Sequence, residues 1–186
     1  MTKKQQLIKL NNEFDSNLLI KDIKKYNCAE LLERDDERAY TAIEKAVFYS
    51  AFVIRKLIDC KEKVSDDIDS YKITVRGVVP TKHINFKNRI PSEETYDWNK
   101  ISTYTKSGKQ ICNWLIHSYV FIFCCKDDNT YGSFFVSSDL DKDKCLYEVQ
   151  LDDWVNFIDF VYSDDIVEMA IQYSDGEYKF IKKKRG

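Results

Sequence analysis

The sequence is poor in residues that break regular structure or bind metals, with five Gly, two Pro and two His among 186 residues. So little Gly and Pro excludes a low-complexity chain, while 44% hydrophobic and 14% aromatic residues exclude intrinsic disorder. No apolar run approaches the roughly 20 residues that a membrane-spanning helix needs. The longest, Ala46 to Ile58, is interrupted by Ser50, Arg55 and Lys56. We therefore expect a soluble globular protein without a membrane segment.

Motifs of the common enzyme classes are also absent. The chain has neither the GxxxxGK[ST] phosphate loop nor the GxGxxG dinucleotide turn, and neither the GxSxG nucleophile elbow nor the HExxH zinc motif. Asp139, Asp141 and Asp143 alternate like the opening of a calcium loop, but Lys144 and Gln150 stand where such a loop needs Gly and Glu. We expect these acids to form a solvated turn, and we expect no bound metal and no cofactor.

The start of the chain has two lysines but neither the apolar core nor the cleavage site of a secretory signal. The cysteines are therefore expected to be reduced thiols in a cytoplasmic protein. No two of them have the CxxC spacing that many zinc sites use. The six are Cys28, Cys60, Cys112, Cys124, Cys125 and Cys145.

Helical periodicity dominates the first third of the chain. Leu7, Leu10 and Phe14 recur at helical spacing, and apolar residues then repeat at three and four positions from Ala39 to Ile58. Asp35 and Asp36 offer an N-cap for that second helix, because a carboxylate accepts the unpaired N–H groups of a first turn. Its apolar arc is so broad that we expect it to be covered from more than one side.

After residue 70 the pattern changes to alternation and to short apolar runs, which are typical of strands. The predicted strands are 71–76, 119–125, 131–138 and 145–151, followed by a hairpin of 167–173 and 177–181. Two helices are predicted between them, at 106–118 and from Asp152 to Val161. The stretch from Thr81 to Thr103 has no strong periodicity and reads as a long connection, with one short strand at His83 to Phe86.

Helices first and strands later are typical of an α+β fold. The pattern predicts N-terminal helices packed on a mainly antiparallel sheet that the C-terminal two-thirds of the chain forms. We expect one domain over residues 1–186, with a helical part over about 1–64 and a sheet-rich part over about 70–182. Strand order and oligomeric state are left open.

A near-neutral total charge of −2 hides a segregation of charge along the chain. Residues 70–92 contain five basic residues and no acid, whereas residues 139–168 contain ten acids and two lysines. The segment 182–185 is basic again. Such segregation favours two separate partner surfaces, and the alternative is that the two segments face each other in the fold.

Asn113 and His117 form the most specific polar pair in the sequence. Four residues apart on a predicted helix, they share one face about one turn apart. A histidine is able to act as a general base near neutral pH, and an asparagine is able to orient it or to hold a phosphate. The alternative is that His117 is a core residue bonded to the backbone and that Asn113 braces a neighbouring turn.

The segment from Cys112 to His117 resembles the end of the ribonuclease motif of HEPN domains. Those helical domains carry an Arg, often followed directly by Asn, with a His a few residues later. Here Asn113 and His117 match, and Cys112 stands where the Arg belongs. The resemblance implies RNA cleavage without a metal, with a guanidinium to stabilise the transition state, and Arg55 is the candidate substitute. Arg55 as an ion-pair partner of Glu44 or Asp59 is the alternative.

The stretch from Tyr71 to Trp98 mixes cations with aromatic rings. Single-stranded nucleic acid is bound by that combination, because cations contact phosphates and rings stack on bases. The alternative is that the rings attach a long loop to the core while the cations stay in water. The candidate nucleic-acid-binding residues are Lys72, Arg76, Lys87, Arg89 and Trp98.

Three functions therefore remain. The leading hypothesis is a cytosolic, non-enzymatic binding or regulatory protein that acts through contacts with a protein partner. The alternatives are a small metal-independent ribonuclease that uses His117, Asn113 and Arg55, and a single-stranded nucleic-acid binder. The absence of catalytic motifs and the separated charges favour the first.

Overall fold

The computed structural model describes residues 16–60 and 63–186, so the helix expected through Leu7, Leu10 and Phe14 lies outside the described residues. The elements follow the chain in this order: α2 (Ser16–Tyr26), α3 (Ala29–Arg34), α4 (Asp36–Asp59), α5 (Asp67–Ser70), β1 (Lys72–Pro80), β2 (Tyr96–Ser107), α6 (Gly108–Ile116), β3 (Ser118–Cys125), β4 (Tyr131–Ser138), β5 (Leu146–Gln150), α7 (Leu151–Tyr162), β6 (Ile166–Ser174) and β7 (Glu177–Arg185).

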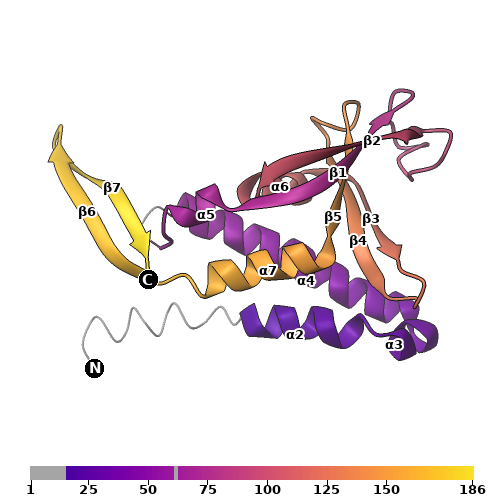
Figure 1. Ribbon diagram of the computed structural model, residues 1–186, viewed down its shortest axis with the longest axis horizontal. Helices are drawn as coiled ribbons and strands as arrows, with labels where there is room; N and C mark the ends of the chain where they lie inside the picture. The colour runs from indigo at the N-terminus through magenta and orange to yellow at the C-terminus, as the bar shows by residue number, and fades with distance from the viewer. Residues whose placement is uncertain (1–15, 61–62) are drawn as a thin grey trace.

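The expected α+β class is confirmed. Helices come first, and strands β1 to β5 then form an antiparallel sheet with the order β2-β1-β5-β4-β3. Strands β6 and β7 form a separate two-stranded sheet. In Figure 1 the long β1–β2 ribbon lies on one side of α4 and α7, and α2 with α3 lies on the other. None of the helices in the described ranges is both long and apolar enough to cross a membrane.

Helix α4 is the central element. It begins where predicted, because the Asp35 side chain accepts a hydrogen bond from the Arg38 N–H, as an N-cap does. Buried side chains on α4 repeat at helical spacing from Ala39 to Ile58. They belong to the main hydrophobic core, which also contains residues of α2, α6, α7 and the sheet. The broad apolar arc in the sequence is thus explained by cover from more than one side.

One buried hydrogen bond joins α4 to α7. The Trp154 indole N–H donates to the Ser50 hydroxyl at 3.1 Å, and both side chains are fully buried. Ser50 donates in turn to the Val47 carbonyl. This hydrogen bond replaces the one that each group would make with water, so neither the buried indole nor the buried hydroxyl is left with an uncompensated desolvation cost.

A second, smaller core lies on the opposite face of the five-stranded sheet. It contains Val78, Ile84, Tyr96, Val120 and Leu146. The segment 81–95 supplies Ile84 and covers one end of this face, which explains why a stretch without regular structure carries buried apolar residues. Burial raises the pKa of Tyr96 to about 12, and its hydroxyl is the one buried polar side-chain atom of the described residues without a hydrogen bond.

The connection after β1 is shorter than predicted. β2 begins at Tyr96, so residues 96–103 belong to a strand, and no strand forms at His83 to Phe86. The prediction was wrong because β2 is an edge strand of the sheet and its residues 99–103 are exposed on both faces. An edge strand with so little buried side has no alternation of polar and apolar residues to detect.

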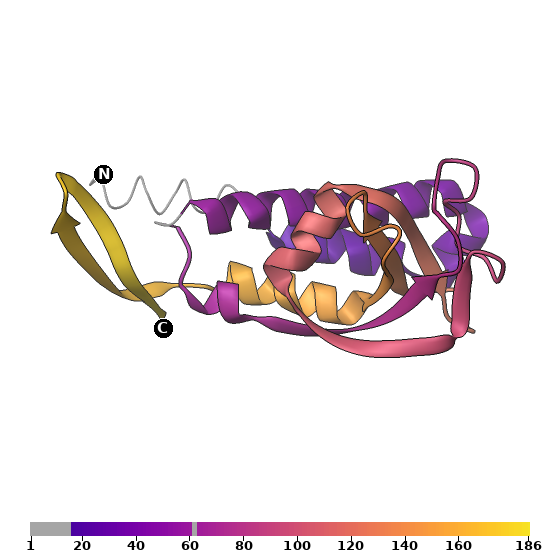
Figure 2. The same ribbon diagram turned by 90° about the horizontal axis from the view of Figure 1, so that it is seen from above.

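The β6–β7 hairpin stands away from the rest of the molecule, as Figure 2 shows from a second direction. Its turn was predicted, and Asp175 and Gly176 have the positive φ values of 57° and 82° that a tight hairpin turn requires. No residue of the five-stranded sheet pairs with either strand. The hairpin therefore forms an arm rather than part of the core.

Replacing Gly108 with Ala tests how closely α6 packs on α7. A Cβ at residue 108 would collide with the fully buried Phe157 ring. We expect Gly108→Ala to lower the free energy of unfolding by about 1–3 kcal/mol, as overpacking does. Gly132→Ala is the matched control, because its Cβ would meet only the flexible Lys126 side chain, and we expect a change within about 0.5 kcal/mol. Equal effects in urea unfolding would contradict close packing at Gly108.

Candidate functional site

Two of the three residues proposed for RNA cleavage meet in the structure. α4 packs on α6, and the Arg55 Nε–H donates to the Asn113 side-chain carbonyl at 2.7 Å. Arg55 also forms an ion pair with Asp59 one turn further along α4. The hydrogen bond from Arg55 holds the pKa of the Asp59 carboxyl below its usual value. The alternative role of Arg55, pairing with Asp59, is therefore observed.

His117 lies on the same helix as Asn113 but at its end. It is the C-cap of α6, where its main-chain N–H donates to the Asn113 carbonyl at 3.1 Å and its carbonyl accepts from the Asp139 N–H. The imidazole is exposed and not buried in the core, and it has no hydrogen bond or ion pair with any described residue. The structure thus joins Arg55 to Asn113 through their side chains but connects His117 to Asn113 only through the backbone.

This arrangement has limited catalytic capacity. Stabilising a transition state at phosphorus needs a guanidinium whose donors point at the reacting oxygens. Arg55 instead directs Nε to Asn113 and Nη1 to Asp59, whose carboxylate neutralises its charge. Cavities of about 590, 360, 270 and 220 Å³ open on the described surface, and none of these four is lined by Arg55, Asn113 or His117.

The five candidate nucleic-acid-binding residues do not share one environment. Lys72 and Arg76 project from the same side of β1, and Lys87 and Arg89 are exposed on the segment that follows β1. Trp98 is half-buried, where its ring packs edge-on against Tyr96 and Phe135 and its N–H donates to the Ser92 carbonyl. The role of Trp98 seen here is to attach the loop to the second core. Binding of nucleic acid remains a prediction.

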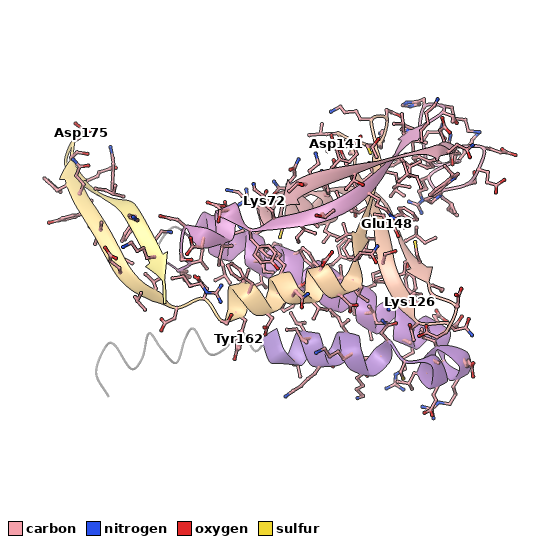
Figure 3. All side chains as sticks on the ribbon, viewed as in Figure 1. Lys72, Lys126, Asp141, Glu148, Tyr162 and Asp175 are labelled. Carbon is pink, nitrogen blue, oxygen red and sulfur yellow. The ribbon has the colours of Figure 1, made fainter. Side chains whose placement is uncertain are left out.

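Arg76 belongs to a polar cluster that sequence analysis missed. Its guanidinium donates to Glu148 on β5, with 2.8 Å from Nε and 2.5 Å from Nη2 to the same carboxylate oxygen. The other oxygen of Glu148 accepts from the Ser133 hydroxyl at 2.7 Å. Glu148 is buried, and its label in Figure 3 lies where β5 meets β1. Cys124 lies beside Ser133, and burial raises the pKa of its thiol, which favours the protonated form.

The segregated charges of the sequence partly cancel within the fold. Arg76 and Glu148 join the basic segment 70–92 to the acidic segment 139–168. His83 and Asp143 join them a second time, at 3.0 Å, and Asp143 also accepts from the Ile84 N–H. That N–H keeps the pKa of Asp143 below its usual value. The two segments thus meet at two points, as the alternative to two separate partner surfaces expected, while Lys72, Lys87 and Arg89 have no ion pair within the described residues.

Exposed apolar side chains gather on the β6–β7 hairpin. The register places Tyr173 opposite Tyr178 and Ile171 opposite Phe180, so apolar side chains gather on one face. Tyr173 is 62% exposed, Tyr178 is 76% exposed, and their rings lie 4.9 Å apart. The other face is charged and contains Glu168, Lys182 and Lys184. We call the first face the hairpin face and define it by Met169, Ile171, Tyr173, Tyr178 and Phe180.

The base of the hairpin is firmly attached. Lys183 is buried, and its ammonium group donates to the Val64 carbonyl at 2.7 Å and lies 3.4 Å from Asp66. Asp66 and Lys183 also bond through their main chains, and the Arg185 guanidinium lies 3.9 Å above the centre of the Phe160 ring. The arm is therefore held at its base, while its tip, labelled at Asp175 in Figure 3, extends away from the body.

Other centres of chemistry are not evident in the described residues. No three His, Cys, Asp or Glu side chains of residues 16–60 and 63–186 are grouped so that they could hold a metal ion. Comparison with protein-family models, with curated protein sequences and with solved structures finds no match to this chain. The geometry of its own surfaces therefore has to support any assignment of function.

The role of Arg76 can be separated from nucleic-acid binding by its effect on stability. Arg76→Met leaves the buried Glu148 carboxylate without its cation, and we expect the free energy of unfolding to fall by about 1–3 kcal/mol. Lys72→Met on the same side of β1 removes a cation that has no ion pair in the described structure, and we expect a change within about 0.5 kcal/mol. Urea unfolding of both variants checks this, and equal stabilities would argue against a structural role for Arg76.

Proposed function

We propose that the chain is a cytosolic, non-enzymatic binding protein that recognises a protein partner through the hairpin face. The observation that carries the proposal is the exposure of four apolar side chains on an arm whose strands pair only with each other, namely Met169, Ile171, Tyr173 and Tyr178. Exposed apolar patches that are rimmed by polar residues mark interaction sites. Tyrosines suit such a site, because each buries about 150–250 Å² and keeps a polar group at its edge.

The architecture of the arm supports the same conclusion. A two-stranded hairpin is marginally stable in water unless a further layer packs on it. Here the hydrogen bonds to the body come from the base, through Lys183 and Arg185, and further along the arm Phe180 lines a cavity of about 270 Å³ that it shares with the body. A partner that covered the hairpin face would supply the missing layer, and the charged residues of the opposite face would remain in solvent. A stable base keeps the arm oriented, so little conformational entropy would be lost on binding.

Photo-crosslinking tests the proposal directly. A benzophenone amino acid placed at residue 178 in the full chain is expected to give a discrete adduct with another protein in cells, because Tyr178 is the most exposed residue of the hairpin face. The same probe at residue 140 is the matched control, since Leu140 is also highly exposed but lies alone in a turn. We expect no discrete adduct from residue 140.

The outcomes of that experiment are decisive. An adduct from residue 178 that disappears on Ile171→Asp, with the thermal unfolding midpoint unchanged, supports recognition through the hairpin face. A homodimeric adduct alone would overturn recognition of a different protein and would assign the face to self-association. Identical patterns from residues 178 and 140 would overturn the proposal altogether.

Ribonuclease activity is the second candidate, and the Arg55–Asn113 hydrogen bond is the observation in its favour. A general base supplies about 10²–10⁴-fold in rate. If the protein cleaves RNA with His117 as this base, cleavage in the presence of a chelator is lost on His117→Ala. His83→Ala is the control, because His83 is the other exposed histidine and is bound to Asp143. We expect no cleavage by the unmodified protein, and His117-dependent cleavage would contradict the binding assignment.

A further inference from the structure

A groove follows the free edge of the sheet at β3. Strand β3 is last in the strand order, so its outer row of main-chain N–H and C=O groups pairs with no other described strand. Residues 118–122 line a cavity of about 360 Å³ along this edge. The unpaired edge of a sheet is a template for another strand, and natural proteins usually block it. Here the edge opens into a groove.

The groove has two different walls. Glu44 and Phe48 of α4 form one wall, and the Phe48 ring lies 4.7 Å from the Phe121 ring of β3. The segment after β1 forms the other wall with Arg89, Ile90 and Pro91. Both walls combine apolar side chains with one charge. A strand laid beside β3 would direct alternate side chains to the α4 wall and to the opposite wall.

The charges of the two walls are not used by the fold. Within the described residues, neither Glu44 nor Arg89 has an ion-pair partner, although both line the same groove. Burial beside apolar groups raises the pKa of the Glu44 carboxyl, as expected for an acid without a cation. Ile90 is 71% exposed on the rim. Unpaired charges of opposite sign on the two walls favour complementary charges in whatever fills the groove.

We propose that this groove binds an extended peptide segment of a partner protein, which adds to β3 as a further strand. The spacing of the α4 wall defines the side chains of that segment. Glu44 and Phe48 are about 6 Å apart along the helix, from a rise of 1.5 Å per residue. Residues i and i+2 of a strand are about 7 Å apart. A basic residue and an apolar residue two positions apart, in either order along the peptide, therefore match Glu44 and Phe48.

The residue between these two faces the other wall, where Arg89 favours an acid. The segment recognised thus has an acidic residue between a basic and an apolar residue, and the direction of strand addition decides which of these two comes first. Main-chain hydrogen bonds to the β3 edge supply affinity and the two walls supply specificity, as in other cases of strand addition. This site lies apart from the hairpin face, so the inference goes beyond the function proposed above and stands or falls without it.

Selection from a library of random seven-residue peptides, displayed against the full chain, tests the proposal. We expect enrichment of an acidic residue flanked by a basic residue on one side and an apolar residue on the other. A labelled synthetic peptide of the enriched sequence is expected to bind about tenfold more weakly to Glu44→Lys, which repels its basic residue, and a peptide with an acid in that place is expected to restore binding. Glu33→Lys, an exposed acid on α3 outside the groove, is the control and leaves binding unchanged.

Two further measurements test the charge of the second wall and the pairing of the peptide backbone with β3. Arg89→Glu changes an exposed residue, so weaker binding by this variant cannot come from unfolding. N-methylation of the peptide backbone at alternate positions is expected to abolish binding in one register and to spare it in the other, because only every second N–H faces the sheet. Lack of enrichment, or enrichment that Glu44→Lys and Arg89→Glu do not alter, would overturn the proposal. Crosslinking of a second copy to residue 122 would assign the edge to self-association and would overturn it too.

Discussion

The burial of α4 is the constraint on which the rest of the structure depends. A helix with apolar residues over so wide an arc is stable only when separate layers cover it, and here α2 and α3 cover one side while α6, α7 and the sheet cover others. Because these helices all occupy one face of the sheet, the other face is left to a loop, which covers only one end of it. The β6–β7 hairpin comes after all the layers are complete, so it has no core of its own to join.

Most of the elements could be predicted because their signals are local. The N-cap at Asp35, the alternation along β1 and the turn at Asp175 each depend on a few neighbouring residues. β2 escaped prediction because Ile101 and most of its neighbours are exposed on an edge strand, where burial imposes no period. Burial alternates only where one face of a strand meets the core, and β2 has little such contact.

The sites were harder to predict because they depend on pairs of residues far apart in the chain. The sequence suggested Arg55 and Asn113 for one site only through the resemblance to HEPN domains, and the packing of α4 on α6 brings them together across 58 positions. Glu148 gave no signal, because its partner Arg76 is 72 positions away and is reached only when β1 lies beside β5. Strand order is a long-range property that composition and periodicity do not encode. The sequence predicted the hairpin but not the exposure of the hairpin face, for the same reason. That exposure depends on where the other elements of the fold lie, and a local pattern does not give their positions.

The attachment of the arm through Lys183 has a consequence for how the molecule opens. The buried ammonium group is held by Val64 and Asp66, which lie in the connection after α4, and Arg185 is bonded to Phe160 and Ser163, so loss of these few bonds would release the arm without disturbing the main core. Such a unit undergoes local unfolding independently of the global transition. The run from Lys182 to Arg185 offers trypsin a series of cleavage sites that are shielded only while the strand is paired. The rate of cleavage there would therefore report the free energy of releasing the arm alone, and a bound partner would slow it.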